Sequence, residues 1–268
     1  MTSTAARARS FDAWAPEYDR YRPGYPDALF DEIAKRLGLP HQPTVADLGA
    51  GTGRAALAMA ERGWQVTAVE PGEPMLDVLR ARASSDGLPV ATRQASAEET
   101  GLDPASVDLA TAAQAFHWFD RPRAVVEMAR IVRPRGGIAL FWNVRDASRS
   151  PLVAEYHQLL EHHFGDGETG RYLQAGWATG RDATRSAFDG VSSFDGLALT
   201  EIQHDLTMTA DEFVGMAFTA SYVRALRSDA QEAFRAQLVE LLARHETSGR
   251  PLAIPYRVDL WTARRKDR

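Results

Sequence analysis

The sequence predicts an α/β fold, a doubly wound, Rossmann-like sheet of seven mostly parallel strands with helices on both faces. Apolar segments of five to seven residues alternate with longer helical patterns between residues 44 and 143. Apolar strands separated by helical stretches of this length are typical of βαβ units, whose parallel sheet is buried on both faces. The first apolar segment also ends in three alternating glycines. Ligands of such folds bind at the carboxyl ends of the strands, so these glycines mark the expected site.

Composition places the chain among ordinary globular proteins. It has 268 residues, of which 44% are hydrophobic and 25% are charged. It contains no cysteine, which excludes disulfides, thiolate zinc sites and cysteine nucleophiles. The formal net charge of −5 argues against nucleic acid as a partner. No apolar stretch could span a bilayer and residues 1–10 lack a secretory signal, so we expect a cytoplasmic protein without membrane association.

The segment before the first expected strand is rich in aromatic residues and interrupted by prolines. It reads F-D-A-W-A-P-E-Y-D-R-Y-R-P-G-Y-P-D-A-L-F from residue 11. Pro26 suits the first turn of a helix that we expect to run to Leu37. So many aromatic side chains outside a sheet are expected to pack over either the core or a ligand. We therefore expect residues 1–43 to form an N-terminal helical lid.

Residues 44–145 form the expected ligand-binding core. Strands are expected at 44–48, 65–70, 90–94, 107–113 and 138–143. Helices are expected at 54–61, 74–83 and 122–132. Glycine and proline punctuate the pattern between these elements, most densely just before the fifth strand.

The pattern loosens after this core, and residues 146–268 are expected to add a helical substrate-capping insertion and to complete the sheet. Helices are expected at 151–164, 211–226 and 229–245, and strands at 197–208 and 254–262. Thr209, with Glu212 three residues later, has the pattern of a capping box at the start of the second of these helices.

The glycine-rich turn could bind one of three classes of nucleotide-like ligand. The first strand and the turn read V-A-D-L-G-A-G-T-G-R from Val45. A phosphate-binding loop of nucleoside triphosphatases ends in Gly-Lys-Ser/Thr, whereas this turn ends in Gly-Arg-Ala. A dinucleotide fingerprint needs glycine or alanine at Arg54, where an arginine would obstruct close packing of helix on strand. This disfavours a nicotinamide-dependent oxidoreductase, which remains an alternative.

An acidic residue follows the second expected strand. Glu70 closes Q-V-T-A-V-E, twenty-one residues after Gly49. A carboxylate at this position can accept hydrogen bonds from both hydroxyls of a ribose. This chemistry suits an adenosine-containing methyl donor and a nicotinamide cofactor equally.

Several motifs together resemble class I S-adenosylmethionine-dependent methyltransferases. They are G-x-G-x-G with Asp47 two residues upstream, the acidic residue just described, P-G-E-P-M-L after it and Q-A-S-A-E-E after the third strand. The resemblance covers about residues 11–143 and implies S-adenosyl-L-methionine as the cofactor. It implies that Met75 lies on the adenine, and that Ser96 and Ala97 read the adenine edge. The cofactor-binding residues that it implies are Tyr18, Arg22, Asp47, Gly49, Ala50, Gly51, Glu70, Pro71, Met75, Ser96, Ala97, Glu98 and Gln114.

A narrower resemblance is to the trans-aconitate methyltransferase-like branch of this family. It rests on F-D-x-W-A-x-x-Y-D-x-Y-R-P-x-Y-P near the start and A-Q-A-F-H-W-F-D after the fourth strand. The branch implies a small-molecule acceptor, in many members within natural-product pathways. Tyr18 matches the lid position, where an aromatic face can stabilise a sulfonium, and Tyr21 and Tyr25 are further candidates. Arg22 is expected to pair with the carboxylate of the donor.

His117 is the candidate general base, since it follows a strand and an imidazole has a pKa suited to proton transfer near neutrality. The alternative is a hydrogen-bonded structural residue under the site. Gln114, at the carboxyl end of the fourth strand, is better placed to contact donor or acceptor. His162 and His163 are adjacent and point in different directions on a helix, so no metal site is expected.

The acceptor is the least determined part of the function. The fourth strand lacks the N/D-P-P-Y/F signature that grips amino groups in nucleic acids and proteins, which favours a small molecule. Aromatic residues of the second half could line an apolar acceptor site, although core packing explains them equally well. These residues are Trp177, Phe188, Phe194, Phe218 and Tyr222. A relative that holds the cofactor without methylating, for instance in a cyclisation, remains an alternative, and the chain could be a monomer or a homodimer.

Overall fold

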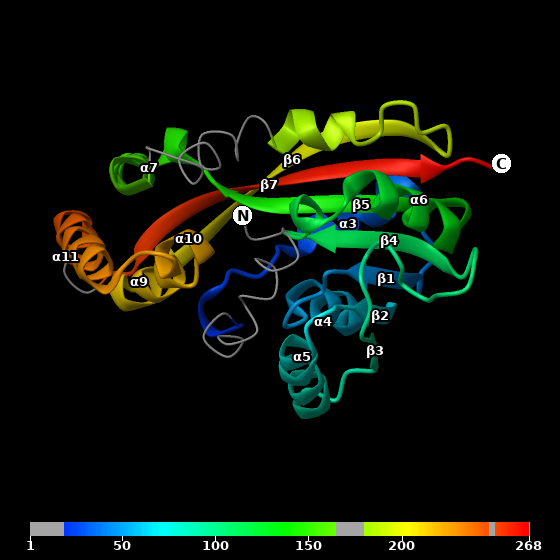
Figure 1. Ribbon diagram of the computed structural model, residues 1–268, viewed down its shortest axis with the longest axis horizontal. Coiled ribbons are helices and arrows are strands. Elements are labelled where there is room, and N and C mark those ends of the chain that lie inside the picture. The colour runs from blue at the N-terminus through cyan, green and yellow to red at the C-terminus, as the bar shows by residue number, and fades with distance from the viewer. Residues whose placement is uncertain (1–18, 165–179, 247–249, 268) are drawn as a thin grey trace.

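The computed structural model describes residues 19–164, 180–246 and 250–267. In these residues seven strands form one mixed sheet in the order β3-β2-β1-β4-β5-β7-β6 (Figure 1). The parallel strands are β1 (Thr44–Leu48), β2 (Gln65–Val69), β3 (Val90–Arg93), β4 (Val107–Ala113) and β5 (Val132–Arg145). Strand β7 (Leu252–Arg265) runs antiparallel between β5 and β6 (Phe194–Met208). The predicted α/β fold with a mostly parallel sheet is confirmed.

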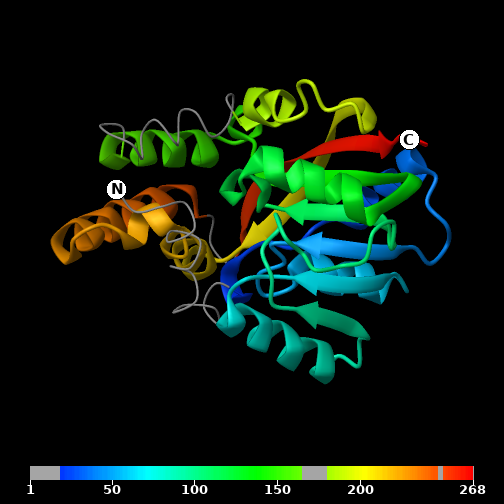
Figure 2. The same ribbon diagram turned by 45° about the vertical axis from the view of Figure 1, so that its right-hand side comes forward.

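Helices cover both faces of the sheet (Figure 2). One face packs against α3 (Asp27–Leu37), α4 (Arg54–Glu61) and α5 (Glu73–Ser85), and the other against α6 (Arg121–Ile131). Strand β1 serves both cores, because successive side chains of a strand point to opposite faces. Val45 belongs to the first core, and Ala46 and Leu48 belong to the second. Among the described residues, no helix combines the length and apolar character needed to cross a bilayer.

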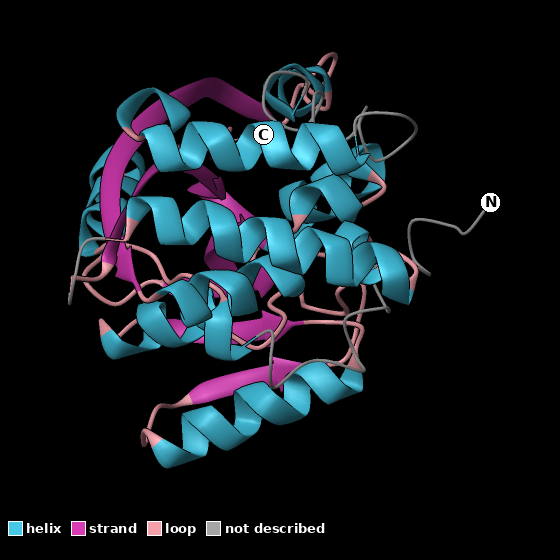
Figure 3. Cartoon of the chain, turned by 90° about the vertical axis from the view of Figure 1, so that its left-hand side faces the viewer, coloured by secondary structure: helices cyan, strands magenta, loops and turns pink. Residues whose placement is uncertain are grey.

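Four helices form a third apolar cluster, which we call the cap. They are α7 (Pro151–Phe164), α9 (Ala210–Phe218), α10 (Ser221–Arg224) and α11 (Ser228–His245). Strands β5, β6 and β7 are 14, 15 and 14 residues long. Their ends extend beyond β1 to β3 and reach the cap helices (Figures 1 and 3). The long strands therefore carry the cap at the carboxyl end of β5.

Strand β5 is longer than predicted, since it begins at Val132 rather than at residue 138. Val107 of β4 pairs with Val132, and the next pair of the ladder joins Leu109 to Gly137. The intervening residues form a bulge, in which Arg135 has a φ of 68°. A bulge tolerates proline and glycine, because its extra residues need no ladder hydrogen bonds. For this reason the proline and the two glycines in this segment do not end the strand.

The helix predicted at 211–226 is divided into α9 and α10. Ala220 is extended, with φ −73° and ψ 131°, and interrupts the helix. The Thr219 hydroxyl donates to the carbonyl of Met216 at 2.6 Å. The carbonyl of Thr219 in turn accepts from Nη2 of Arg22 at 3.3 Å. Side chains thus satisfy the carbonyl groups at the end of α9, which the sequence pattern alone does not reveal.

Residues 19–26, which we call the strap, connect the core to the cap. The ring of Tyr21 packs against Gly215 of α9, where an added Cβ would lie 2.5 Å from the ring. The carbonyl of Gly24 accepts from Nδ2 of Asn143 on β5 at 2.9 Å. The strap therefore lies between the carboxyl end of β5 and the cap.

The predicted capping box of α9 is present and provides a test of the fold. Thr209 Oγ1 accepts from the N–H of Glu212 at 3.2 Å, and Glu212 Oε2 accepts from the N–H of Thr209 at 2.8 Å. We expect Thr209→Ala to lower the free energy of unfolding by about 1 kcal/mol, because a backbone N–H at the helix start loses its acceptor. Urea denaturation measures this, with Thr209→Ser as the matched control that keeps the hydroxyl. Equal stability of the two variants would contradict the expectation.

Candidate functional site

The turn after β1 is fixed to the carboxyl end of β2. The backbone N–H groups of Gly49 and Ala50 both donate to the carbonyl of Val69, at 2.8 and 3.2 Å. The φ angles of Gly49, Gly51 and Gly53 are 65°, 57° and 87°, in the left-handed region that favours glycine. The turn leads directly into α4, whose first N–H groups and positive dipole end face it.

The three glycines differ in what surrounds them. A Cβ at Gly49 would lie 2.7 Å from the Cβ of Ala115, and one at Gly53 would lie 2.5 Å from Leu79. Packing of the protein itself therefore requires these two glycines. A Cβ at Gly51 would meet no protein atom within 4 Å. Gly51 is thus the point of the turn at which a ligand can approach the backbone.

The carboxylate of Glu70 lies beside this point. Its Oε2 accepts from the N–H of Gly51 and its Oε1 accepts from the N–H of Gly72, each at 3.0 Å. A carboxylate oxygen can accept more than one hydrogen bond, so ribose hydroxyls can bind at these same oxygens. The fold thus brings together a backbone N–H and an acidic side chain that are 19 residues apart in the chain.

Asp47 is completely buried beneath the turn. Its Oδ1 accepts from the hydroxyl of Thr111 at 2.7 Å, and its Oδ2 is buried without a hydrogen-bond partner among the described residues. Burial raises the pKa of Asp47 to about 7 and the charge of Glu70 adds to the rise, whereas the hydroxyl of Thr111 and the backbone N–H of Ala56 oppose it. The carboxylate is therefore poorly stabilised by the protein alone, and a nearby cationic group would favour its charged form.

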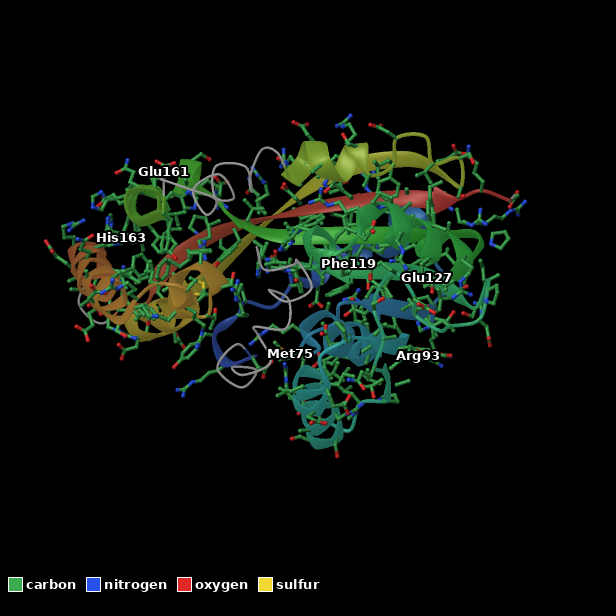
Figure 4. The ribbon with its side chains drawn as sticks, in the orientation of Figure 1. Met75, Arg93, Phe119, Glu127, Glu161 and His163 are labelled. Atoms are coloured by element: carbon green, nitrogen blue, oxygen red, sulfur yellow. The ribbon has the colours of Figure 1, made fainter. Side chains whose placement is uncertain are left out.

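The segments that follow β2 and β3 reach the same edge of the sheet, because these strands are adjacent and parallel. Met75 lies in the first turn of α5 and is buried (Figure 4). Ala97 is also buried, and Ser96 forms an isolated antiparallel bridge with Glu99. The two segments that the resemblance assigns to the adenine are therefore neighbours of the turn.

Pro71 and Glu98 hold backbone segments at this edge. The carbonyl of Pro71 accepts from Nε2 of Gln94 at 3.3 Å. Oε1 of Glu98 accepts from the N–H of Asp120 at 2.8 Å, which connects the turn after β3 to the start of α6. In this arrangement Glu98 fixes a loop, and its expected contact with a cofactor stays a prediction.

Gln114 follows β4 in an unusual backbone conformation. Its φ is 54°, which is uncommon for a residue other than glycine. Its N–H donates to the carbonyl of Phe141, and its Nε2 donates to the carbonyl of Asn143 at 3.3 Å. Residues held in this region occur preferentially at functional sites, because the surrounding structure must offset their strain. The backbone of Gln114 thus supports its predicted place at the site.

His117 lies in the short 3₁₀ helix η2 (Phe116–Trp118). Its Nδ1 accepts from the indole N–H of Trp142 at 3.3 Å, so the proton of the neutral ring is on Nε2. Burial, with Arg121 and Arg22 nearby, lowers the pKa of His117 to about 4. The ring is therefore neutral at pH 7 and weakly basic. This chemistry suits a hydrogen-bond donor better than the predicted general base.

The strap lies against the turn as well as against the cap. Asp19 accepts from Nη1 of Arg82 at 2.6 Å and lies 4.0 Å from Nε of Arg54, the first residue of α4. Tyr25 packs its ring edge against Phe141, with centroids 4.9 Å apart, and is thus part of the core. The assigned role of Arg22 toward a donor carboxylate stays a prediction, as do those of Tyr18 and Trp177, which lie outside the described residues.

The remaining aromatic candidates belong to two different clusters. Phe188 and Phe194 pack on the α6 side of the sheet, whereas Phe218 and Tyr222 pack within the cap. The four of these aromatics that the structure describes therefore do not form one group, and their packing in two apolar clusters fits the core-packing alternative. The described residues also contain no group of three His, Cys, Asp or Glu side chains that could hold a metal ion.

Arg145 and Tyr156 were missed by the sequence analysis. Arg145 ends β5, and its guanidinium lies over the ring of Tyr156 on α7, 5.1 Å from the centroid. The sequence feature that could have marked Arg145 is an arginine at the end of an apolar strand, two residues after Asn143. Its partners come from the cap, whose helices cannot be placed against β5 from sequence alone.

The buried Asp47 predicts a specific pH dependence of stability. The folded protein binds the Asp47 proton more tightly than the unfolded chain, so this group removes stability as the pH rises from about 4 to about 7. We expect Asp47→Asn to gain stability relative to wild type between pH 5 and pH 8, by at most about 4 kcal/mol. Denaturation curves at both pH values measure the gain, with the exposed Asp86→Asn as control. A stability difference between Asp47→Asn and wild type that does not change with pH would contradict the assignment.

Known protein sequences and solved structures both match this chain. The family described as methyltransferase domain matches residues 46–140. An uncharacterized methyltransferase of Mycobacterium tuberculosis is 42% identical over 155 residues, which are 56% of this chain and 58% of that protein. The chain thus spans little more than half the length of this curated relative.

Two solved structures extend the comparison to the cap. A structure from Anaeromyxobacter dehalogenans, described as a type II methyltransferase, is 30% identical and has a TM-score of 0.66, covering 91% of this chain and 98% of its own. The [4+2]-cyclase SpnF has a TM-score of 0.59 at 18% identity, covering 99% of this chain and 97% of its own, and therefore shares the fold. With the sheet order and the glycine turn described above, these matches show that the chain belongs to the class I methyltransferases.

Proposed function

We propose that this protein transfers the methyl group of S-adenosylmethionine to a small-molecule acceptor. The observation that carries the proposal is the joint placement of Gly51, Glu70 and Asp47 at the carboxyl ends of β1 and β2. Gly51 leaves space for a ligand, Glu70 offers acceptors for ribose hydroxyls, and Asp47 favours a cation. These three properties fit a donor that carries a ribose and positive charge.

The chain's own residues would hold this donor in a defined orientation. When bound, the donor supplies a methyl group activated by a sulfonium, so the reaction needs little covalent help from the protein. Met75, Ser96 and Ala97 would contact the adenine, as the resemblance implies. Gln114, whose side chain is fixed to the carbonyl of Asn143, would face the donor or the acceptor. Alignment of the reacting atoms then provides much of the acceleration.

A weakly basic His117 limits the kinds of acceptor that the site suits. With a pKa of about 4, it would be a poor acceptor for the proton of a hydroxyl at pH 7. Acceptor atoms that are already nucleophilic without a base, such as a carboxylate oxygen or a free amine, fit this site better. In this proposal Nε2–H of His117 orients the acceptor by a hydrogen bond.

The strap and the cap support a small acceptor. Both lie at the carboxyl end of β5, beside the edge at which the donor would bind. Their position suits the domain organisation predicted from the sequence, in which residues 1–43 form a lid and residues 146–268 include a substrate-capping region. The trans-aconitate methyltransferase-like motifs also point to a small molecule, in keeping with a natural-product pathway.

A non-methylating reaction on the same fold is the second candidate. The similarity to the [4+2]-cyclase SpnF supports it, because one fold can serve unrelated reactions. The two candidates differ in the fate of the donor. Methyl transfer releases S-adenosylhomocysteine in proportion to product, whereas a cyclase would bind the donor and leave it unchanged.

Calorimetry with S-adenosylmethionine and S-adenosylhomocysteine tests the proposed donor. We expect Glu70→Gln to weaken binding of both by about tenfold or more, because charge-assisted hydrogen bonds to ribose contribute about 1.5–3 kcal/mol. Glu99→Gln, at an exposed position nearby, should bind like wild type. No detectable binding by the wild-type protein at millimolar ligand would refute the proposed function. Tight binding of NAD instead would favour the oxidoreductase alternative.

Substitutions of two of the three glycines in the turn, Gly51 and Gly53, offer a second test. We expect Gly51→Ala to fold with a loss of about 1–2 kcal/mol, from backbone conformation alone, and to lose most of its affinity for S-adenosylhomocysteine. Gly53→Ala should lose more stability, because its Cβ also collides with Leu79. Thermal unfolding and calorimetry on both variants measure the contrast. Wild-type affinity in Gly51→Ala would show that no ligand approaches the backbone there.

A further inference from the structure

Arg145 is a partly buried cation at the junction of β5 and the cap. Its guanidinium lies 5.1 Å from the ring centroid of Tyr156 and 6.0 Å from that of Tyr256, its register partner on β7. Its Nη2 lies 3.9 Å from the sulfur of Met216 on α9, and its Nε is buried without a hydrogen-bond partner. Aromatic rings and a thioether therefore form most of its surroundings.

No carboxylate of the described residues forms an ion pair with Arg145. Neighbouring arginines do have such partners. Arg149 pairs with Asp205, and Arg257 pairs with Asp259, both at 2.8 Å. A guanidinium stays charged at any accessible pH, so removing part of it from water without an anion nearby is unfavourable. Cation–π contacts offset only part of this penalty.

A second polar group, beside Nε of Arg145, also lacks a hydrogen-bond partner among the described residues. Tyr156 is completely buried, and its hydroxyl makes no hydrogen bond with the described residues. Burial raises the pKa of Tyr156 well above its usual range, so the hydroxyl is a neutral donor. Nε of Arg145 and the hydroxyl of Tyr156 are thus two buried donors on neighbouring side chains, and neither has a hydrogen-bond partner among the described residues. An anionic oxygen is the group that would satisfy both.

This pair lies near the edge at which the donor is proposed to bind. Arg145 is two residues beyond Asn143 on β5, and therefore on the same face of the strand and about 7 Å further along it. Asn143 accepts from Gln114 and donates to the strap. The charge of Arg22 on the strap acts on both Tyr156 and His117. Arg145 and the residues at the end of β4 are therefore parts of one continuous region.

We propose that Arg145 and the hydroxyl of Tyr156 bind an anionic group of the acceptor, a carboxylate or a phosphate monoester. The inference rests on the proposed function and names the class of acceptor. The rings of Tyr156 and Tyr256, with Met216, would contact an apolar part next to the anion. Arg145 would then set specificity, by requiring a negative charge at a fixed distance from the methyl group.

The test uses small anions as probes on the full-length protein saturated with S-adenosylhomocysteine. The carboxylates are propionate, hexanoate and trans-cinnamate, and phenyl phosphate represents phosphate esters. The primary amides of the three acids are the neutral controls. Calorimetry and ligand-observed NMR measure binding. We expect at least one anion to bind at millimolar concentration. The amide of a bound carboxylic acid should bind at least tenfold more weakly than the acid. Whichever of cinnamate and phenyl phosphate binds more tightly identifies the anionic group of the acceptor.

Variants assign the binding to the proposed pair. We expect Arg145→Gln to weaken anion binding at least tenfold and Tyr156→Phe to weaken it several-fold, with unchanged affinity for S-adenosylhomocysteine. Arg145→Lys, which keeps the charge, should retain part of the binding if Arg145→Gln fails to fold. Arg149→Gln removes an exposed arginine four residues away and should bind like wild type.

Three results would overturn the inference: equal binding of acids and amides, full anion binding by Arg145→Gln, or no binding of any anion to the wild-type protein. Failure of S-adenosylhomocysteine to bind is a separate result, since it refutes the proposed function. The anion measurements are then made on the ligand-free protein. Binding that depends on Arg145 would support the anion site in that case as well, and its absence would refute it.

Discussion

The hydrogen bonds from the turn after β1 to the carbonyl of Val69 are the constraint on which the site depends. They fix Gly49 and Ala50 to the end of β2, and the chain must then pass through left-handed conformations before α4 begins. This path directs the N–H of Gly51 toward Glu70, the residue that follows β2. The neighbouring parallel strands bring the segments after β3 and β4 to the same edge. The turn and the ends of the neighbouring strands together thus set the positions of the groups proposed to hold the donor.

A buried carboxylate and a partly buried guanidinium lie in the region proposed for catalysis. Asp47 beneath the turn has a pKa near 7 because the protein gives it little compensation. Arg145 at the end of β5 has aromatic neighbours and no carboxylate partner among the described residues. Each charge destabilises the ligand-free fold, and a ligand of opposite charge would reverse that effect. The pair fits a reaction in which a cationic donor meets an anionic acceptor.

The strap joins these two halves of the proposed reaction. Asp19 interacts with Arg82 and Arg54 beside the donor edge, whereas Tyr21 packs against Gly215 of the cap. A segment that contacts both sides can exclude water only when both are in place, which suits in-line transfer between two bound molecules. The hydrogen-bonded, neutral ring of His117 fits the same picture, because transfer to a nucleophilic anion requires no strong base.

The sheet, the turn and the capping box at Thr209 are predictable from the sequence, because each depends on local periodicity or on a few residues at fixed spacing. The position of Glu70 is predictable as well, since the end of a parallel strand has a known place in the fold. Which glycine leaves open space could be seen only in the folded structure, as packing against Ala115 and Leu79 distinguishes Gly49 and Gly53 from Gly51. The tertiary structure likewise decided the state of His117 and the surroundings of Arg145. Both depend on burial and on partners from distant elements, which no local pattern encodes.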